Sequence, residues 1–145
     1  MRISEVMSPE VRIADPDDTI QDVAQIMEDT DVGFLPVGED DRLVGMVTDR
    51  DITIRAVARG LDPHTTRVRE VMTDKVLYCF ETDDVQEAAR SMAELRVRRL
   101  PIVNGDKRLV GVVSLGDIAF LHSASIAGRA LESVCSPGAS PRLVS

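Results

Sequence analysis

Residues 43–52 read LVGMVTDRDI, and residues 109–118 read LVGVVSLGDI. Each copy is an apolar run with a central glycine that ends at a hydroxyl residue, and an aspartate follows three positions later. Three further segments return in the same order at an offset of 65, namely residues 6–8, 20–27 and 35–37 as residues 71–73, 85–92 and 100–102. The offset grows to 66 because one residue is added in the loop at 104–107. Several motifs in one order indicate a duplicated structural unit.

Each repeat begins with an amphipathic helix. Apolar residues at i, i+3, i+4 and i+7 form one stripe of a helix, and they occur as Ile20, Val23, Ala24 and Met27 and again as Val85, Ala88, Ala89 and Met92. The second set predicts a helix over 84–95. Capping boxes are predicted where an aspartate is followed three residues later by a glutamine, in the pairs Asp18–Gln21 and Asp83–Gln86.

A hairpin and a second helix follow in each repeat. The apolar runs at 34–37 and 43–47 flank an acidic turn at 38–41, which is typical of a β-hairpin. A helix is predicted from Asp49 to Gly60, where glycine suits the position after a helix end. Repeat two predicts strands near 99–103 and 109–113 and a helix over 115–123.

These elements predict an α/β (α+β) fold of two pseudo-symmetric units, each ordered strand, helix, strand, strand, helix. Two such units packed sheet to sheet would share one core. The expected organisation is repeat one at 1–62, repeat two at 63–123 and a tail at 124–145. The tail has helical spacing at Ile126, Ala130, Leu131 and Val134, followed by a flexible end over the last nine residues.

Composition excludes several functional classes. The 145 residues carry a net charge of −8 with three Phe, one Tyr and no Trp, which argues against nucleic-acid binding and against binding to anionic membranes. No apolar run approaches a membrane span and the start lacks a signal-peptide core, so a cytoplasmic chain is expected. Residues 1–60 carry 14 acids and 6 bases, whereas residues 61–145 carry 11 of each. An anion site is therefore expected in the second part.

The doubled series resembles a tandem pair of CBS domains, the module named after cystathionine β-synthase. The shared pattern covers residues 3–123, from Val-Met-Ser/Thr through the helix and the apolar-x-Pro strand to Leu-Val-Gly-x-Val-Ser/Thr-x-x-Asp-Ile. The stretch at 47–52 also resembles small bacterial proteins made only of such a pair. The resemblance implies a pseudo-symmetric disc with two clefts between the repeats, adenosine-containing ligands in many members, and a homodimer.

The resemblance places ligand contacts at the two strand-to-helix junctions. The matching aspartates, Asp51 and Asp117, bind ribose in the family, and the matching hydroxyl residues, Thr48 and Ser114, lie near phosphate. A helix start offers free N–H groups to an anion. The same spacing also fits two plain capping boxes.

Basic residues next to the apolar-Pro strand contact phosphate in family members that bind it. Arg98 and Arg99 stand there in repeat two, and guanidinium groups suit phosphate oxygens. Both could instead form a solvated basic edge. Repeat one has Gly33 and Phe34 at these positions, so the two clefts need not bind equally. Arg50 could add charge beside Asp51, or it could pair with Asp49.

The adenine is expected in an apolar slot beside the strands that open each repeat. The resemblance assigns residues 11–13 and 76–78 to this slot, with Ile13 and Tyr78 equivalent by the offset of 65. It also places Pro36 and Pro101 among the nucleotide-binding residues. From the residues themselves, Tyr78 is expected to be an ordinary core or rim tyrosine, with stacking on the base as the alternative.

No catalytic set is visible, so the chain is not predicted to be an enzyme. The leading hypothesis is a stand-alone regulatory module that senses an adenine nucleotide such as AMP, ADP or ATP, with no obligatory cofactor and an unidentified protein target. One alternative is an interaction module with empty clefts that acts through its dimer faces. The other is a metal- or redox-responsive protein, although its candidate residues lack metal-ligand spacing: Cys79, Cys135, His64 and His122.

Overall fold

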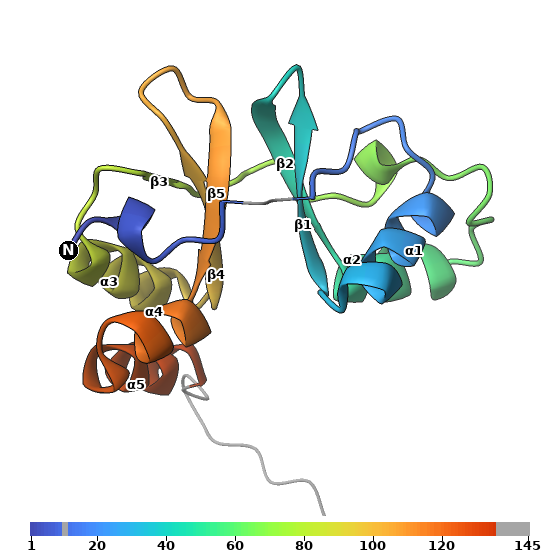
Figure 1. Ribbon diagram of the computed structural model, residues 1–145. Helices are drawn as coiled ribbons and strands as arrows, with labels where there is room; N and C mark the ends of the chain where they lie inside the picture. Colours follow the sequence, from blue (N-terminus) through green and yellow to red (C-terminus); the bar gives the residue numbers. More distant parts are fainter. Residues whose placement is uncertain (10–11, 136–145) are drawn as a thin grey trace, which may run out of the picture. The chain divides into compact units, whose positions relative to one another are not determined.

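The computed structural model describes residues 1–9 and 12–135, apart from the side chain of Leu95, as two compact units (Figure 1). The N-unit comprises Glu10–Leu77 and Gly105–Leu109. The C-unit comprises Met1–Pro9, Tyr78–Asn104 and, among the described residues, 110–135. Both units combine helices with strands, which confirms the α+β prediction. None of the described helices has the length and apolar character needed to cross a membrane.

The N-unit is a two-stranded antiparallel sheet with its helices. Its elements are α1 (Ile20–Thr30), β1 (Phe34–Glu39), β2 (Arg42–Thr48), α2 (Asp49–Ile52), the π-helical turn η2 (Thr53–Val57) and the 3-10 helix η3 (Val68–Glu70). Asp40 and Asp41 form the hairpin turn in the left-handed region, with φ of 54° and 64°, as tight hairpin turns require. The helix predicted to Gly60 ends at Val57, and Gly60 follows with φ of 70°.

The C-unit is built on a three-stranded sheet in the order β3-β4-β5, with β3 parallel to β4. Its elements are the 3-10 helix η1 (Ile3–Glu5), β3 (Cys79–Phe80), α3 (Val85–Leu95), β4 (Arg99–Val103), β5 (Leu109–Ser114), α4 (Leu115–Leu121) and α5 (Ala124–Cys135). The helical spacing seen in the tail therefore does form a helix, whereas the predicted flexible end lies outside the described residues.

The strand that opens each repeat is short. In the C-unit it is the two-residue β3, so residues 76–78 precede the strand instead of forming it. In the N-unit it shrinks to one parallel bridge between Ala14 and Val37, and Val11 lies outside the described residues. The pairing stops because a polar turn follows at once, closed by the Asp83 carboxylate on the Phe80 N–H at 2.9 Å.

Both predicted capping boxes at the first helices are wrong, namely the pairs Asp18–Gln21 and Asp83–Gln86. The N-caps are Thr19, whose hydroxyl accepts from the Asp22 N–H, and Asp84, whose carboxylate accepts from the Gln86 N–H. Asp18 and Asp83 each accept instead from the N–H three residues earlier, at 2.9 Å. Their carboxylates close the turn before the helix, so the cap moves one residue on.

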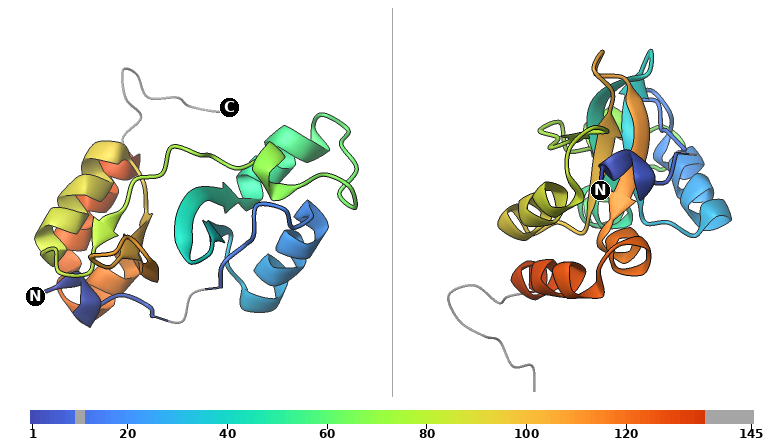
Figure 2. Two further views of the ribbon diagram at one scale, coloured as in Figure 1. Left: turned by 90° about the horizontal axis from the view of Figure 1, so that it is seen from above. Right: turned by 60° about the vertical axis from the view of Figure 1, so that its left-hand side comes forward.

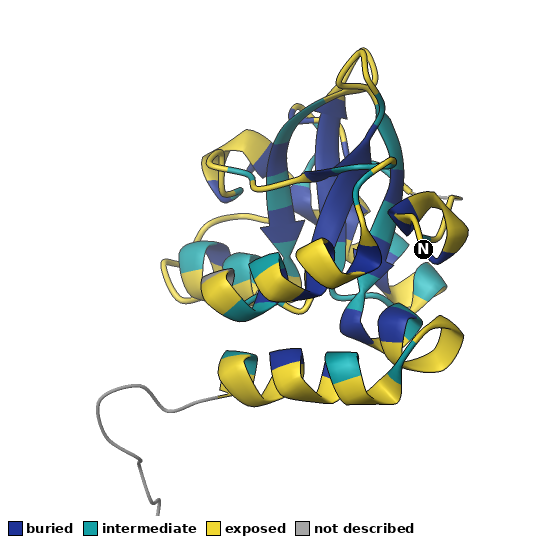
Figure 3. Ribbon diagram, turned by 90° about the vertical axis from the view of Figure 1, so that its left-hand side faces the viewer, coloured by how far each residue is buried: buried dark blue, intermediate teal, exposed yellow. Residues whose placement is uncertain are grey.

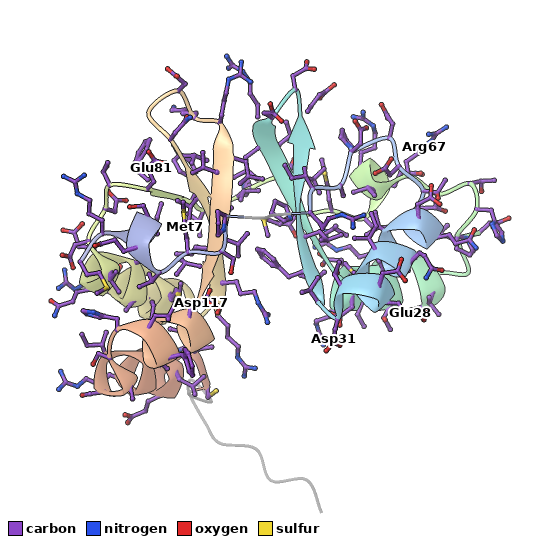
Figure 4. The ribbon with its side chains drawn as sticks, in the orientation of Figure 1. Met7, Glu28, Asp31, Arg67, Glu81 and Asp117 are labelled. Atoms are coloured by element: carbon purple, nitrogen blue, oxygen red, sulfur yellow. The ribbon has the colours of Figure 1, made fainter. Side chains whose placement is uncertain are left out.

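The compact units do not follow the repeat boundaries at 62 and 123, because the segment that leads each repeat packs into the unit of the other repeat. Ile3 belongs to the C-unit core at 0% exposure, and its counterpart Val68 belongs to the N-unit core at 0%. The glycine of each LVG motif permits this approach. A Cβ on Gly111 would lie 2.6 Å from the Met7 sulfur, and one on Gly45 would lie 2.6 Å from the Met72 sulfur. Figure 4 shows Met7 beside β5.

Helix α5 makes the two units different. It lies along α3 and contacts α4, as Figure 2 shows, and Figure 3 shows buried residues recurring along one face of it. Ala89 of α3 is 3% exposed and shares a core with Ala127 and Ala130 of α5. Its counterpart Ala24 on α1 is exposed, contrary to the predicted stripe, because the described residues of the N-unit contain no counterpart of α5 to cover it: only the three-residue 3-10 helix η3 follows η2 there.

Candidate functional site

The two strand-to-helix junctions have the same geometry. In the C-unit, the Ser114 N–H donates to Asp117 Oδ2 at 2.9 Å and the Asp117 N–H donates to Ser114 Oγ at 3.0 Å. In the N-unit, Thr48 and Asp51 make the same two bonds at 3.0 Å each. Both pairs are therefore capping boxes. Figure 4 shows Asp117 at the start of α4.

Capping leaves part of each pair available to a ligand. Each carboxylate uses Oδ2 in the cap, and within residues 1–9 and 12–135 its Oδ1 makes no hydrogen bond. Each hydroxyl accepts a bond in the cap and keeps its own proton to donate. All four residues are half-buried. A ribose hydroxyl could donate to Oδ1, and a phosphate oxygen could accept from the hydroxyl, without breaking the cap.

Arg98 and Arg99 lie at the start of β4, and both are exposed. The Leu115 N–H donates to the Arg98 carbonyl at 2.9 Å, which fixes the start of α4 against the start of β4. Arg98 Nη2 donates to Cys135 Sγ at 3.4 Å. The guanidinium of Arg99 has no hydrogen bond or ion pair within the described part of the chain.

These arginines open onto a pocket of about 480 Å³ within the C-unit. Ten residues line it: Arg98, Arg99, Ser114, Leu115, Gly116, Ala119, Ala124, Ala127, Gly128 and Leu131. The lining has two cations, one hydroxyl, no carboxylate and seven Ala, Gly or Leu residues. Ligand pockets are usually apolar with a few polar groups and measure about 300–1,000 Å³. Asp117 is not part of the lining, but Ser114 joins the pocket to the Asp117 cap.

The N-unit junction lacks these cations. Gly33 and the half-buried Phe34 stand where the C-unit has its two arginines. Arg50 is exposed, and its backbone N–H donates to Asp49 Oδ1 at 2.8 Å. No ion pair of the Arg50 guanidinium occurs in residues 1–9 and 12–135. Thr48 and Asp51 therefore lie together at the junction, without counterparts of Arg98 and Arg99 beside them.

The residues assigned to the adenine slot have mixed positions. Ile13 is half-buried and packs on Gly38, where an added Cβ would lie 2.9 Å from its Cγ2. Tyr78 is 40% exposed and meets Phe80 edge-to-face at 5.6 Å between ring centroids. Pro36 and Pro101 are buried within β1 and β4.

The cysteines and histidines do not gather. The described residues contain no group of three or more His, Cys, Asp or Glu side chains able to hold a metal ion. Cys79 is buried and Cys135 is exposed, and both are free thiols. Burial, with nearby acidic side chains, raises the pKa of Cys79 to about 11.

Sequence reasoning missed one part of the site, the pocket wall formed by α5. The spacing of the tail indicated a helix, but its pocket-lining residues Ala124, Gly128 and Leu131 are small or apolar and give no functional signal by themselves. Only their position opposite the two arginines makes them part of a site.

Comparison with protein families matches two copies of the CBS domain, at residues 3–57 and 68–122. Hypoxic response protein 1 of Mycobacterium tuberculosis is 38% identical over 134 residues, which are 92% of this chain and 93% of that protein. Its crystal structure, described with two coordinated zinc ions, covers 83% of this chain at a TM-score of 0.74 and 40% identity, and 98% of that chain is covered.

Two further solved structures are similar. The CBS domain pair of protein MJ0100, in complex with 5′-methylthioadenosine and S-adenosyl-L-methionine, is 25% identical with a TM-score of 0.74, covering 86% of this chain and 98% of that chain. A hexameric CBS-CP12 protein from bloom-forming cyanobacteria is 31% identical with a TM-score of 0.73, covering 86% of this chain and 74% of that one.

Proposed function

Because the chain belongs to the CBS-domain family as a tandem pair, we propose that it is a regulatory module that senses an adenine nucleotide such as AMP, ADP or ATP. Ligand binding would change its conformation or its dimer and so signal to an unidentified protein. It has no catalytic role and needs no obligatory cofactor, and the expected location is the cytoplasm. The observation that carries the proposal is the C-unit pocket, where two arginines and Ser114 border an apolar wall.

Each group in the C-unit has a proposed role. Asp117 Oδ1 accepts a ribose hydroxyl, while Oδ2 keeps the cap on α4. The Ser114 hydroxyl donates to a phosphate oxygen. Arg99 and Arg98 bind the phosphate with charge-assisted hydrogen bonds. Because phosphate is the part of the ligand that both guanidinium groups recognise, a phosphorylated adenosine fits this unit better than an unphosphorylated one.

The adenosine part of the proposal is supported by a relative. The MJ0100 pair is described with 5′-methylthioadenosine and S-adenosyl-L-methionine, which share an adenosine and lack a phosphate. The matching junctions in this chain supply two half-buried carboxylates, Asp51 and Asp117, at which a ribose can bind. Tyr78 and Ile13 are the proposed apolar neighbours of the base, beside Pro36 and Pro101.

An interaction module is a second candidate, favoured by exposed apolar residues at equivalent positions of the two repeats. Ile54 is 47% exposed and its counterpart Phe120 is 89% exposed. Such residues suit a homodimer, and the hexameric CBS-CP12 protein is a relative that assembles. The metal-responsive alternative is supported by the zinc-containing relative. It lacks a ligand cluster within the described part of this chain.

A thermal-shift screen tests the proposal. With AMP, ADP or ATP at about 100 times the dissociation constant, binding contributes about 2.7 kcal/mol. For a chain of this size the melting temperature rises by about 5–10 °C. Guanine nucleotides should give no comparable rise. Equal shifts with both bases, or no shift with either, would refute adenine-nucleotide sensing.

A pocket-filling variant makes the test specific to the site. Gly128→Met places a side chain into the pocket, and an added Cβ at Gly128 has no atom within 4 Å, so the helix tolerates it. The matched control is Gly105→Met, because Gly105 has equally open surroundings but does not line the pocket. Gly128→Met should abolish the AMP-induced shift and Gly105→Met should retain it.

A further inference from the structure

We infer that Asp49 makes the N-unit junction selective against phosphate, so that this site takes an adenosine compound that carries no negative charge. The inference rests on the proposed function, since it assumes that adenosine ligands bind at these junctions. It goes further because it assigns the two units different ligand classes and names the residue that separates them.

The structure identifies which residue of the C-unit corresponds to Asp49. The Asp49 N–H donates to the Gly33 carbonyl at 2.9 Å, and the Leu115 N–H donates to the Arg98 carbonyl at 2.9 Å. The same backbone bond therefore ties the first residue of each helix to the residue just before each strand. Asp49 occupies the position of Leu115, and Gly33 occupies the position of Arg98.

The carboxylate of Asp49 takes the space that a side chain would need at position 33. A Cβ built on Gly33 would lie 2.6 Å from Asp49 Oδ2 and 2.9 Å from its Cγ, closer than such atoms approach. Asp49 Oδ1 is held there by the Arg50 N–H at 2.8 Å. At the position where the C-unit has the guanidinium of Arg98, the N-unit therefore has the carboxylate of Asp49 beside Gly33, which has no side chain.

The charges around the two junctions have opposite signs. The C-unit junction combines Arg98 and Arg99 with the single carboxylate of Asp117, a net charge of +1. The N-unit junction combines Asp49 and Asp51 with the single cation of Arg50, a net charge of −1. Phe34 stands in place of Arg99 and adds apolar surface without charge.

This difference acts on the phosphate and not on the nucleoside. A phosphate placed beside Asp51 as it would be beside Asp117 meets a second carboxylate and the one guanidinium of Arg50 in place of two guanidinium groups. The charges at this junction sum to −1, so they repel the phosphate. An uncharged adenosine keeps the ribose contact to Asp51, and a cationic adenosine compound such as a sulfonium gains attraction from Asp49. The chain is thus built to hold a phosphorylated and an unphosphorylated adenosine compound in different units.

The test measures adenosine and AMP binding by calorimetry in the full chain carrying Asp117→Ala, which removes the ribose contact of the C-unit. Adenosine should bind the remaining site at least about tenfold more tightly than AMP, the effect of one unfavourable charge contact. Adding Asp49→Asn removes the charge and keeps an oxygen for the Arg50 N–H. It should bring the two affinities within about threefold and leave adenosine binding unchanged.

The matched control is Asp29→Asn, because Asp29 is an exposed carboxylate on α1 of the same unit that accepts from Gln25 Nε2 at 3.1 Å. It should leave the adenosine-to-AMP ratio as it is. Three results would overturn the inference and leave the proposed function standing. The Asp117→Ala protein could bind adenosine and AMP with equal affinity, or it could lose adenosine binding. Asp49→Asn could also leave the ratio of the two affinities unchanged. If the unaltered chain binds neither ligand, the proposed function fails and the inference fails with it.

Discussion

Ile3→Ala should destabilise the C-unit, although Ile3 stands 76 positions before the first strand of that unit at Cys79. The Ile3 side chain is 0% exposed, and its N–H donates to the Asp83 carbonyl at 2.9 Å. Truncating a fully buried isoleucine to alanine costs about 2–5 kcal/mol. Since the free energy of unfolding of a natural domain is about 5–15 kcal/mol, this substitution removes a large share of it. The melting temperature should fall by about 4–20 °C.

The assay uses Tyr78, the only tyrosine in a chain without tryptophan, whose fluorescence reports on the C-unit. Urea unfolding followed at Tyr78 should shift to a lower midpoint in Ile3→Ala. Met1→Ala is the control, because Met1 is 52% exposed and should change stability by less than about 0.5 kcal/mol. If Ile3→Ala behaves like Met1→Ala, the leading segment does not pack in the C-unit and the composition of the two units is wrong.

Two further predictions concern the thiols and the assembly. At pH 8 Cys79 should resist a thiol reagent while Cys135 reacts at once, because burial, with acidic neighbours, raises the pKa of Cys79 to about 11 from 9.0. The folded state then binds the proton more tightly than the unfolded state, so the stability from Cys79 is complete below about pH 9 and is lost towards pH 11. Rapid labelling of both thiols in the folded protein would contradict this. Light scattering should give about twice the chain mass of 15.9 kDa, because the apolar residues Ile54, Val57 and Phe120 are exposed, and a monomer at all concentrations would be the contrary result.

Much of the local structure could be predicted from the sequence because the first helix, the hairpin and the strand-to-helix junction of the repeat each occur twice. The hydroxyl–aspartate pairs ending in Asp51 and Asp117 fall at strand-to-helix junctions, as their spacing indicates. Cap positions could not be predicted to the residue, since both Asp18 and Thr19 can cap and only the preceding turn decides between them.

Tertiary partners could not be predicted because equivalent repeats carry interchangeable patterns. Ile3 and Val68 are apolar residues at equivalent positions of the two repeats, yet nothing local in the sequence says that each packs in the unit of the other repeat. The pocket beside Arg99 depends in the same way on α5, whose small residues are unremarkable until the helix is placed opposite the arginines. The sequence shows that Asp49 stands where the second repeat has Leu115. The consequence of this difference is seen only in the structure, where the Asp49 N–H donates to the Gly33 carbonyl and the Leu115 N–H donates to the Arg98 carbonyl.

The central claim is that the C-unit binds the phosphate of an adenine nucleotide, and calorimetric titration of Arg99→Ala with AMP and with adenosine tests it most directly. A charge-assisted hydrogen bond contributes about 1.5–3 kcal/mol, which is about tenfold to over a hundredfold in affinity. Arg99→Ala should therefore weaken AMP binding by that factor and leave adenosine binding nearly unchanged. Asp117→Ala should weaken both at the C-unit, and Asp51→Ala should affect AMP less. An Arg99→Ala protein that binds AMP as tightly as the parent would contradict the claim.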